Sequence, residues 1–183
     1  MLAIPSGGVP VAARIARALD LSLHAVPVSK VLLPWTTESG YGAVAFDGSV
    51  WIAEDAKQRW KLTQSQIEQG IAEARAKVER RNARLRGARP LPEVDGRPVI
   101  LVDDGIAAGS TMRAAIAALR RHNPAEIVIA VPTAHDTSLA VISKIADRIV
   151  CPNIRGGFSF AVADAYETWR DLEEDEVVAM LGL

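Results

Sequence analysis

The sequence predicts an α/β fold in which helices cover both faces of a twisted parallel sheet, with a small hood or lid attached. Short aliphatic runs alternate with stretches of helical apolar spacing, and the links between them are short, as in parallel sheets. The run from Val99 to Val102 is typical of a strand buried on both faces. Because the chain has 183 residues and 49% of them are hydrophobic, we expect a single domain with one core.

The N-terminal part reads as strand, turn and helix. Met1 to Ile4 is apolar, Pro5 to Gly8 predicts a turn, and apolar residues then recur on one helical face as far as Leu19. The next strand is expected at Ala25 to Val28. Asp47-Gly48 stands between two apolar runs, which is a strong hairpin signal, so we expect a hairpin to project from the sheet.

Residues 31–98 are expected to form a lid that contains this hairpin and a long helix. Thr63 to Gln66 reads TQSQ, a capping-box pattern, and apolar residues then recur at helical spacing until the helix ends before Gly87. The other faces of the helix carry six basic residues: Arg75, Lys77, Arg80, Arg81, Arg84 and Arg86. Most proteins leave such a face to solvent. The functional alternative is a lid that faces an anion.

The second half continues the alternation of strands and helices. After Val102 we expect helices at Ser110 to His122 and Thr137 to Ala146, and strands at Ile127 to Val131 and Arg148 to Cys151. Residues 152–183 are expected to form a C-terminal hood segment. Ligands of such sheets bind beyond the carboxyl ends of the strands. The residues that follow Ile4 and Val102 are therefore the first candidates for a site.

The composition excludes several classes of function. Lys and Arg number 21 against 22 Asp and Glu, so the overall charge gives no reason to expect nucleic acid or a membrane as a partner. No run is long enough to span a membrane, and we expect a cytoplasmic protein. Cys151 is the only cysteine, which excludes an intramolecular disulfide and a multi-thiolate metal site. Its place in an apparent strand favours a buried, unreactive thiol.

The local distribution of charge is uneven. Between Lys57 and Pro98 there are 11 basic and 5 acidic residues, whereas Ser159 to Leu183 contains 1 basic and 7 acidic residues. The middle of the chain is therefore basic and its C-terminal part is acidic.

The segment from Val99 to Thr111, VILVDDGIAAGST, combines a buried strand with two acids and a loop of small residues. Asp103 and Asp104 stand where the strand ends, and such carboxylates suit hydroxyl groups or a metal. Small residues before a helix let backbone amides approach an anion, and the helix N-terminus adds partial positive charge. A plain strand-turn-helix junction, an ATPase or a receiver-type fold can also contain such acids. The sequence has no GxxxxGK[ST] motif, which disfavours an ordinary ATPase.

This segment resembles the signature of the type I phosphoribosyltransferases. The resemblance implies that Asp103 and Asp104 hold the ribose hydroxyls of 5-phosphoribosyl pyrophosphate (PRPP) and touch Mg²⁺ directly or through water. It also implies that the 5'-phosphate is bound by the small-residue loop, namely Ala107, Ala108, Gly109, Ser110 and Thr111. Ala107 stands where the hypoxanthine-guanine enzymes carry an acidic general base, so purine salvage is disfavoured and no proton-transfer residue is assigned.

A second loop matches the family's pyrophosphate loop. Ser6, Gly7 and Gly8 follow the first strand, where glycine lets backbone amides point at a diphosphate. Many relatives have a basic residue at the position of Ser6, and we expect Lys30, which follows the second predicted strand, to compensate. A plain tight turn explains PSGG equally well, but its position upstream of VDDG favours the functional interpretation.

The aromatic C-terminal segment supplies candidates for contacts with an acceptor base. In this family a variable hood binds the nucleobase, which here implies Phe158, Phe160 and Tyr166. Simple packing of these rings on the core is the alternative. His135 follows a predicted strand and is the one histidine expected near the cleft.

The resemblance therefore implies a Mg²⁺-dependent phosphoribosyltransferase of nucleotide metabolism. It would transfer the phosphoribosyl group of PRPP to a nucleobase or a related nitrogen acceptor and release pyrophosphate, with no membrane or nucleic-acid partner. A homodimer is expected, because family members often dimerise. Relatives usually carry a helical segment before the first strand, whereas this chain begins within it. The alternatives are a PRPP-sensing regulator that binds RNA or a protein without turnover, and a remnant that binds neither.

Overall fold

The computed structural model of the chain describes residues 1–37, 39–87, 89–157 and 159–183. Its centre is a five-stranded, all-parallel sheet in the order β2-β1-β6-β7-β9. These strands are β1 (Leu2–Ala3), β2 (His24–Ala25), β6 (Pro98–Val102), β7 (Glu126–Ala130) and β9 (Arg148–Val150). The predicted parallel sheet is confirmed, and β6, the strand that the two acids follow, lies at its middle.

Both faces of this sheet are covered, and the two faces belong to different hydrophobic clusters. Leu2 and Leu101 belong to the cluster that also contains the buried residues of α4, whereas Ala3 and Val102 belong to the cluster with α1 and α6. Alternate residues of a strand point to opposite faces, so the continuous aliphatic runs of β1 and β6 fill two cores. The α-helices are α1 (Gly8–Leu19), α2 (Ala56–Arg59), α3 (Gln64–Arg86), α4 (Ser110–Arg120), α5 (Asp136–Ile142) and α6 (Glu174–Met180), and η1 (Val162–Ala165) is a 3-10 helix.

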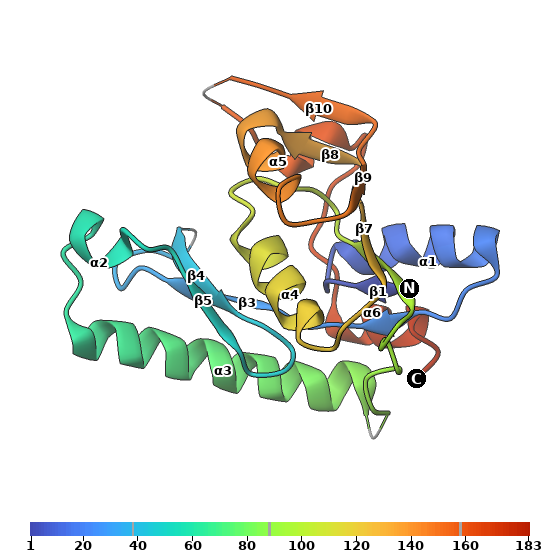
Figure 1. The fold of residues 1–183 in the computed structure, drawn as a ribbon, viewed down its shortest axis with the longest axis horizontal. Coiled ribbons are helices and arrows are strands. Elements are labelled where there is room, and N and C mark those ends of the chain that lie inside the picture. The colour runs from blue at the N-terminus through green and yellow to red at the C-terminus, as the bar shows by residue number, and fades with distance from the viewer. Residues whose placement is uncertain (38, 88, 158) are drawn as a thin grey trace.

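A second, antiparallel unit stands beside the main sheet. It consists of β3 (Ser29–Leu32), β4 (Gly40–Val44) and β5 (Val50–Ile52), with α3 packed along it (Figure 1). The hairpin predicted at Asp47-Gly48 joins β4 to β5, and Gly48 has a φ of 80° there. The unit has its own buried cluster, formed by Val31, Leu33, Tyr41, Val44, Ala56, Leu62, Ala74 and Val78. The unit also packs on the main core, because Ala43 of β4 belongs to the cluster around α4 and Trp51 of β5 packs against that cluster.

The long helix begins with the predicted capping box. The Thr63 hydroxyl accepts a hydrogen bond from the backbone N–H of Gln66 at 3.2 Å, and the Thr63 N–H donates to Gln66 Oε1 at 2.9 Å. The helix ends at Arg86, and Gly87 follows it with a φ of 55°. These caps satisfy backbone groups that a helix end otherwise leaves unpaired.

Several predicted boundaries differ from those of the structure. Of the strand expected at Ala25 to Val28, only Ala25 lies in a strand, because β2 ends there and Pro27 has no N–H to continue the ladder; β3, which was not predicted, begins at Ser29 in the antiparallel unit. Lys30 therefore lies within β3 rather than after a strand. The helix expected to reach Ala146 ends at Ile142, and the strand expected to include Cys151 ends at Val150. Cys151 is half-buried, and burial raises the pKa of its thiol, in line with the expected low reactivity.

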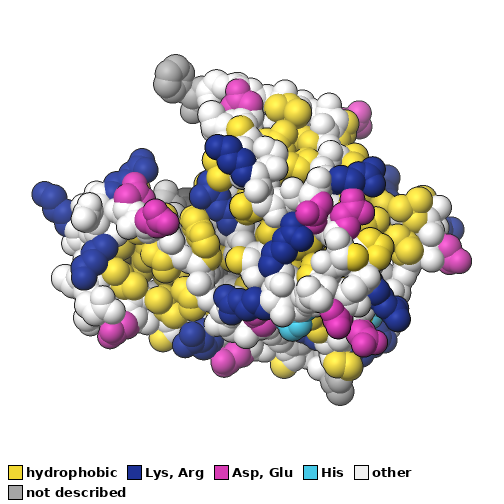
Figure 2. All heavy atoms as spheres, viewed as in Figure 1, with side chains coloured by type: hydrophobic (Ala, Val, Ile, Leu, Met, Phe, Trp, Pro, Cys, Tyr) yellow, Lys and Arg dark blue, Asp and Glu magenta, His cyan; other side chains and the backbone are white. Residues whose placement is uncertain are grey.

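Two further strands were not expected. β8 (Thr133–His135) and β10 (Asn153–Arg155) form a small parallel pair at the end of the molecule that also contains α5 (Figure 1). Ile106, which follows the two acids, bridges to Ala134 of β8. In the space-filling view, the surface is hollowed between the antiparallel unit and this end of the molecule, and basic side chains gather at its wall (Figure 2). None of the helices in the described ranges has the length and apolar character needed to cross a membrane.

Candidate functional site

Two loops meet at the carboxyl ends of β1 and β6, and we call them the glycine loop (residues 5–8) and the acid loop (residues 103–109). The backbone N–H of Ile4 donates to the carbonyl of Val102 at 2.9 Å, which holds the two strand ends side by side. A Cβ on Gly7 would lie 1.7 Å from Asp104 Oδ2, and one on Gly8 would lie 2.9 Å from the Val102 carbonyl oxygen. The loops are packed so closely that only glycine fits at these positions.

The two acids of the acid loop stand side by side, Asp103 buried and Asp104 half-buried. Asp103 is 8% exposed, and its Oδ1 accepts a hydrogen bond from the Asp104 N–H at 2.9 Å. Burial raises the pKa of both carboxyl groups, and the charge of Asp104 raises that of Asp103 further. The ammonium group of Lys30 acts in the opposite direction. The pair is thus poised to receive hydroxyl groups or a cation that compensates its charge.

The small-residue part of the acid loop leads into α4 and encloses a pocket of 170 Å³. Gly109 has a φ of 78°, a left-handed conformation that favours glycine, and α4 begins at the next residue. The N–H groups of a first helical turn have no partner within the helix and point outward, which suits an anion. The pocket is lined by Lys30, Asp103, Asp104, Gly105, Ile106, Ala107, Ala108, Gly109, Ser110, Thr111, Met112 and Val162. The structure therefore brings the residues predicted to bind the 5'-phosphate and the two acids to one pocket, whereas Ser6, Gly7 and Gly8 are not among its lining residues.

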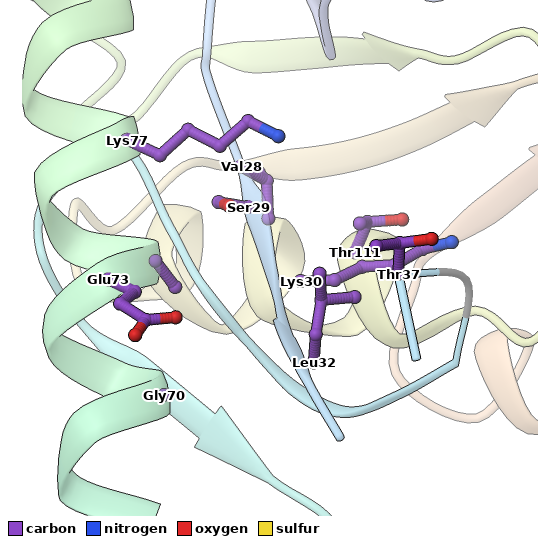
Figure 3. A pocket seen from close by; sticks show the side chains of 10 residues that line it. Val28, Ser29, Lys30, Leu32, Thr37, Gly70, Glu73, Lys77 and Thr111 are labelled. Atoms are coloured by element: carbon purple, nitrogen blue, oxygen red, sulfur yellow. The ribbon is translucent and has the colours of Figure 1, made fainter. Parts of the chain in front are cut away.

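A larger pocket of 360 Å³ adjoins the first one. Lys30 and Thr111 line both pockets, so the two cavities meet at these side chains. Its opposite wall is α3, which contributes Gly70, Glu73, Ala74 and Lys77. Figure 3 shows Lys30 of β3 pointing toward Thr111 and Thr37, while Lys77 reaches from α3 across Val28. Lys30 thus lines both pockets from within β3, and not from a position after a strand as predicted.

The basic residues of α3 have different partners. The guanidinium of Arg81 donates to Ser6 Oγ at 2.9 Å and to the carbonyl oxygen of Pro5 at 3.4 Å, so it reaches the glycine loop. Arg84 forms an ion pair with Asp175 of α6 instead. The basic stretch around Arg80 to Arg89 was expected to close over the pyrophosphate as a group, without distinguishing Arg81 from its neighbours. The signals for it were this run of basic residues and the missing basic residue at position 6.

The C-terminal segment closes one side of the acid loop. Tyr166 donates its hydroxyl hydrogen to the backbone carbonyl of Asp104 at 2.7 Å, and burial together with the two acids raises the pKa of Tyr166 to about 12. A Cβ on Gly105 would lie 2.7 Å from Val162, so η1 also packs directly on this loop. The contact of Tyr166 was not predicted in this form, because its partner is a backbone atom 62 residues away.

The other two predicted base-binding residues have different positions. Phe160 packs edge-on against His135 at 5.4 Å and lies beneath the guanidinium of Arg155 at 4.9 Å. His135, expected near the cleft, has its ring nitrogens 2.7 Å from Thr137 Oγ1 and 2.9 Å from the carbonyl oxygen of Gly157. Phe158 lies outside the described residues. Among the three candidates, the structure thus brings Tyr166 into contact with the acid loop and places Phe160 on a neighbouring ring cluster.

Comparison with known proteins agrees with this geometry. The chain matches the model of the phosphoribosyl transferase domain over residues 1–165, and it belongs to that family. It is 34% identical over 181 residues to proteins from two strains of Mycobacterium tuberculosis that carry the name "Putative phosphoribosyl transferase". These matches cover 99% of this chain and 41% of the relatives, so the chain spans about two fifths of their length.

Solved structures confirm the fold. The crystal structure of TT1426 from Thermus thermophilus is similar with a TM-score of 0.78 at 33% identity, covering 98% of this chain and 85% of that one. A protein from Aquifex aeolicus is similar at a TM-score of 0.52 and 13% identity, over 86% of this chain and 56% of that one. The family and the α/β fold predicted from VILVDDGIAAGST are thereby confirmed.

Proposed function

We propose that this chain is a phosphoribosyltransferase that transfers the phosphoribosyl group of PRPP to a nucleobase or a related nitrogen acceptor and releases pyrophosphate. The observation that carries the proposal is the contact between the glycine loop and the acid loop. Gly7 lies so close to the Asp104 carboxylate that a side chain at position 7 would collide with it. A ligand with phosphates at both ends of a ribose spans two such loops. Membership of the family supports the same substrate.

Each part of PRPP has a complementary part of the site in this proposal. The 5'-phosphate is bound by residues 107–111 at the N-terminus of α4, where backbone N–H groups and the helix dipole favour an anion. Asp103 and Asp104 accept hydrogen bonds from the ribose hydroxyls. The diphosphate lies against Ser6, Gly7 and Gly8, with Lys30 beside it. Holding the ribose rigidly between two anchored ends favours reaction at its anomeric carbon.

The acid pair also fits Mg²⁺ as the cofactor. Mg²⁺ takes oxygen ligands, keeps several waters and is commonly held by one or two carboxylates together with substrate phosphates. Asp103 and Asp104 provide such oxygens, and because burial raises the pKa of both carboxyl groups, a bound cation would favour their charged form. In the described part of the chain no group of three or more His, Cys, Asp or Glu residues could hold a metal, so the remaining ligands would come from PRPP and water. When bound, Mg²⁺ would neutralise charge on the departing diphosphate.

In this proposal two further segments cover the bound PRPP and keep water out of the site. We propose residues 31–98 as a lid and residues 152–183 as a hood, because α3 lines one pocket and η1 lines the other. Excluding water protects a transition state that carries positive charge on the ribose. Phe160 and Tyr166 remain candidates for contacts with the acceptor, and a homodimer remains the proposed assembly.

Calorimetry with PRPP and Mg²⁺ tests this function. We expect the wild-type protein to bind PRPP and the double variant Asp103→Asn with Asp104→Asn to lose that binding. Asp95→Asn is the control, because Asp95 is an exposed residue that pairs with Asn123. Pyrophosphate release would then be measured over a panel of nitrogen bases. Unchanged PRPP affinity in the double variant would overturn the proposal.

The alternative, a PRPP sensor that binds RNA through the basic face of α3, loses support from the structure. Arg81 contacts the glycine loop and Arg84 pairs with Asp175, so both belong to intramolecular contacts. PRPP binding without turnover, together with salt-sensitive RNA binding that Arg80→Ala weakens, would favour the sensor.

A further inference from the structure

The glycine loop carries no cation of its own, although the proposed function places a highly charged diphosphate against it. Ser6 stands where many members of this family have a basic residue. We propose that Arg81 of α3 supplies this missing charge and binds the leaving diphosphate directly, with Lys77 as a second cation on the same helix face. This inference rests on the proposed function, and it assigns a binding role to an element outside the two signature loops.

Arg81 is placed by contacts that aim its guanidinium at the loop. It donates to Ser6 Oγ at 2.9 Å and to the carbonyl oxygen of Pro5 at 3.4 Å, although 75 residues separate it from Ser6. Its side chain is 21% exposed, so it is largely withdrawn from water. A guanidinium presents five N–H donors in a planar fork. The two loop contacts leave other donors available for an anion lying on the same loop.

The charge of Arg81 is only weakly compensated within the protein. Among the described residues the nearest carboxylate is Glu174, whose Oε1 lies 3.9 Å from Arg81 Nε, which is beyond hydrogen-bond distance. Its contacts in the loop are a hydroxyl and a backbone carbonyl, both neutral. Burial accordingly lowers the pKa of Arg81. A buried cation beside neutral partners costs solvation energy, and a bound diphosphate would recover that energy.

Lys77 lies one turn before Arg81 on the same face of α3, since residues at positions i and i+4 of a helix are neighbours. It lines the 360 Å³ pocket together with Ser29, Lys30 and Thr111 (Figure 3). The diphosphate would therefore lie between cations from two elements, Lys30 of β3 on one side and Lys77 and Arg81 of α3 on the other. No single loop of the chain provides this set of charges.

Two ligands separate diphosphate binding from the rest of the site. PRPP and ribose 5-phosphate share the ribose and the 5'-phosphate, but only PRPP has the diphosphate. With Mg²⁺ present, we expect Arg81→Met to weaken PRPP binding in calorimetry by about 10- to 100-fold, the usual range for a charge-assisted hydrogen bond, and to change ribose 5-phosphate binding by less than about 2-fold. Lys77→Met is expected to show the same selectivity with a smaller loss.

Matched variants distinguish direct binding from support of the loop. Arg84→Met is the control, because Arg84 lies three residues further along α3 and pairs with Asp175 at the surface. Arg81→Gln keeps amide N–H donors for the Ser6 hydroxyl and the Pro5 carbonyl but removes the charge. We expect Arg81→Gln to lose PRPP affinity as Arg81→Met does, and Arg81→Lys to recover part of the affinity. If Arg81→Gln binds PRPP as tightly as the wild type, Arg81 acts only through its contacts with the loop and the inference is overturned.

The outcomes also separate the inference from the proposed function. A wild-type protein that fails to bind PRPP overturns both. A wild type that binds PRPP while Arg81→Met binds it equally overturns only the role of Arg81. Thermal unfolding of each variant shows whether it is folded, and if Arg81→Met is not, Arg81→Gln carries the test, because it keeps polar donors for the loop and loses the charge. An Arg81→Gln protein with wild-type affinities for both ligands then contradicts the inference.

Discussion

At the scale of single residues, Asp103 lowers the stability of the folded protein at neutral pH. Its carboxyl group is withdrawn from water and stands beside a second acid, so the protein raises its pKa. The folded chain therefore holds this proton more tightly than the unfolded chain does. As a consequence, the contribution of Asp103 to the free energy of unfolding falls as the pH rises. The fall begins near the ordinary carboxyl pKa of the unfolded chain and is complete above the raised pKa of the folded protein.

Replacing Asp103 with the neutral Asn is expected to stabilise the protein at neutral pH while removing PRPP binding. Asn keeps an oxygen that can accept the Asp104 N–H but carries no buried charge. Thermal unfolding followed over a pH series should show a higher midpoint near pH 7 and a flatter pH dependence than in the wild type. A midpoint that falls near pH 7 in Asp103→Asn would contradict this account of the acid pair.

Gly7 is the residue that sets the distance between the two loops. Because a Cβ at this position would meet Asp104 Oδ2 at 1.7 Å, Gly7→Ala is expected to push the loops apart, lower the unfolding midpoint and weaken PRPP binding. The double variant Gly7→Ala with Asp104→Ala removes the obstructing carboxylate. It should recover stability without recovering PRPP binding, which thermal unfolding and calorimetry would show. A Gly7→Ala protein with wild-type affinity would exclude this role.

At the scale of elements, the C-terminal segment is fastened to the acid loop by the hydroxyl of Tyr166. Since the pKa of this phenol is raised to about 12, it keeps its proton at every ordinary pH. Tyr166→Phe is expected to lower the free energy of unfolding by about 1 kcal/mol, the net value of a hydrogen bond, and by the same amount near pH 6 and near pH 9. Chemical denaturation at both pH values measures this, and a loss confined to one of them would refute it.

At the scale of the whole molecule, a ligand that joins the two loops should stabilise the entire fold. With Mg²⁺ and PRPP at about 100 times the dissociation constant, linkage predicts about 2.7 kcal/mol, or roughly 5 to 10 °C in the unfolding midpoint of a protein of this size. A thermal-shift measurement tests this. The Asp103→Asn and Asp104→Asn double variant serves as the negative control, and an equal shift in that variant would show that the ligand binds elsewhere.

The sequence predicted those parts of the molecule whose cause is local. The Asp47-Gly48 hairpin, the Thr63 capping box and the acid loop each depend on neighbouring residues, and the structure contains all three. Pro27 also acts locally, but its effect on the strand was missed. The contacts of Arg81 with Ser6 and of Tyr166 with Asp104 join distant positions, 75 and 62 residues apart. No periodicity or motif encodes such pairs, because tertiary packing alone decides them.

The strand order of the parallel sheet affects the order in which the parts of the chain fold. β1 pairs with β2 about 20 residues later, but its other neighbour, β6, is synthesised only after the whole antiparallel unit. A two-stranded pair is barely stable alone, whereas three strands packed on a helix can persist. We therefore expect the antiparallel unit to fold first and the parallel sheet to close around β1 afterwards. In pulse-labelled hydrogen exchange, the amides of Tyr41 and Val44 should be protected before that of Ile4, and the reverse order would disprove this sequence of events.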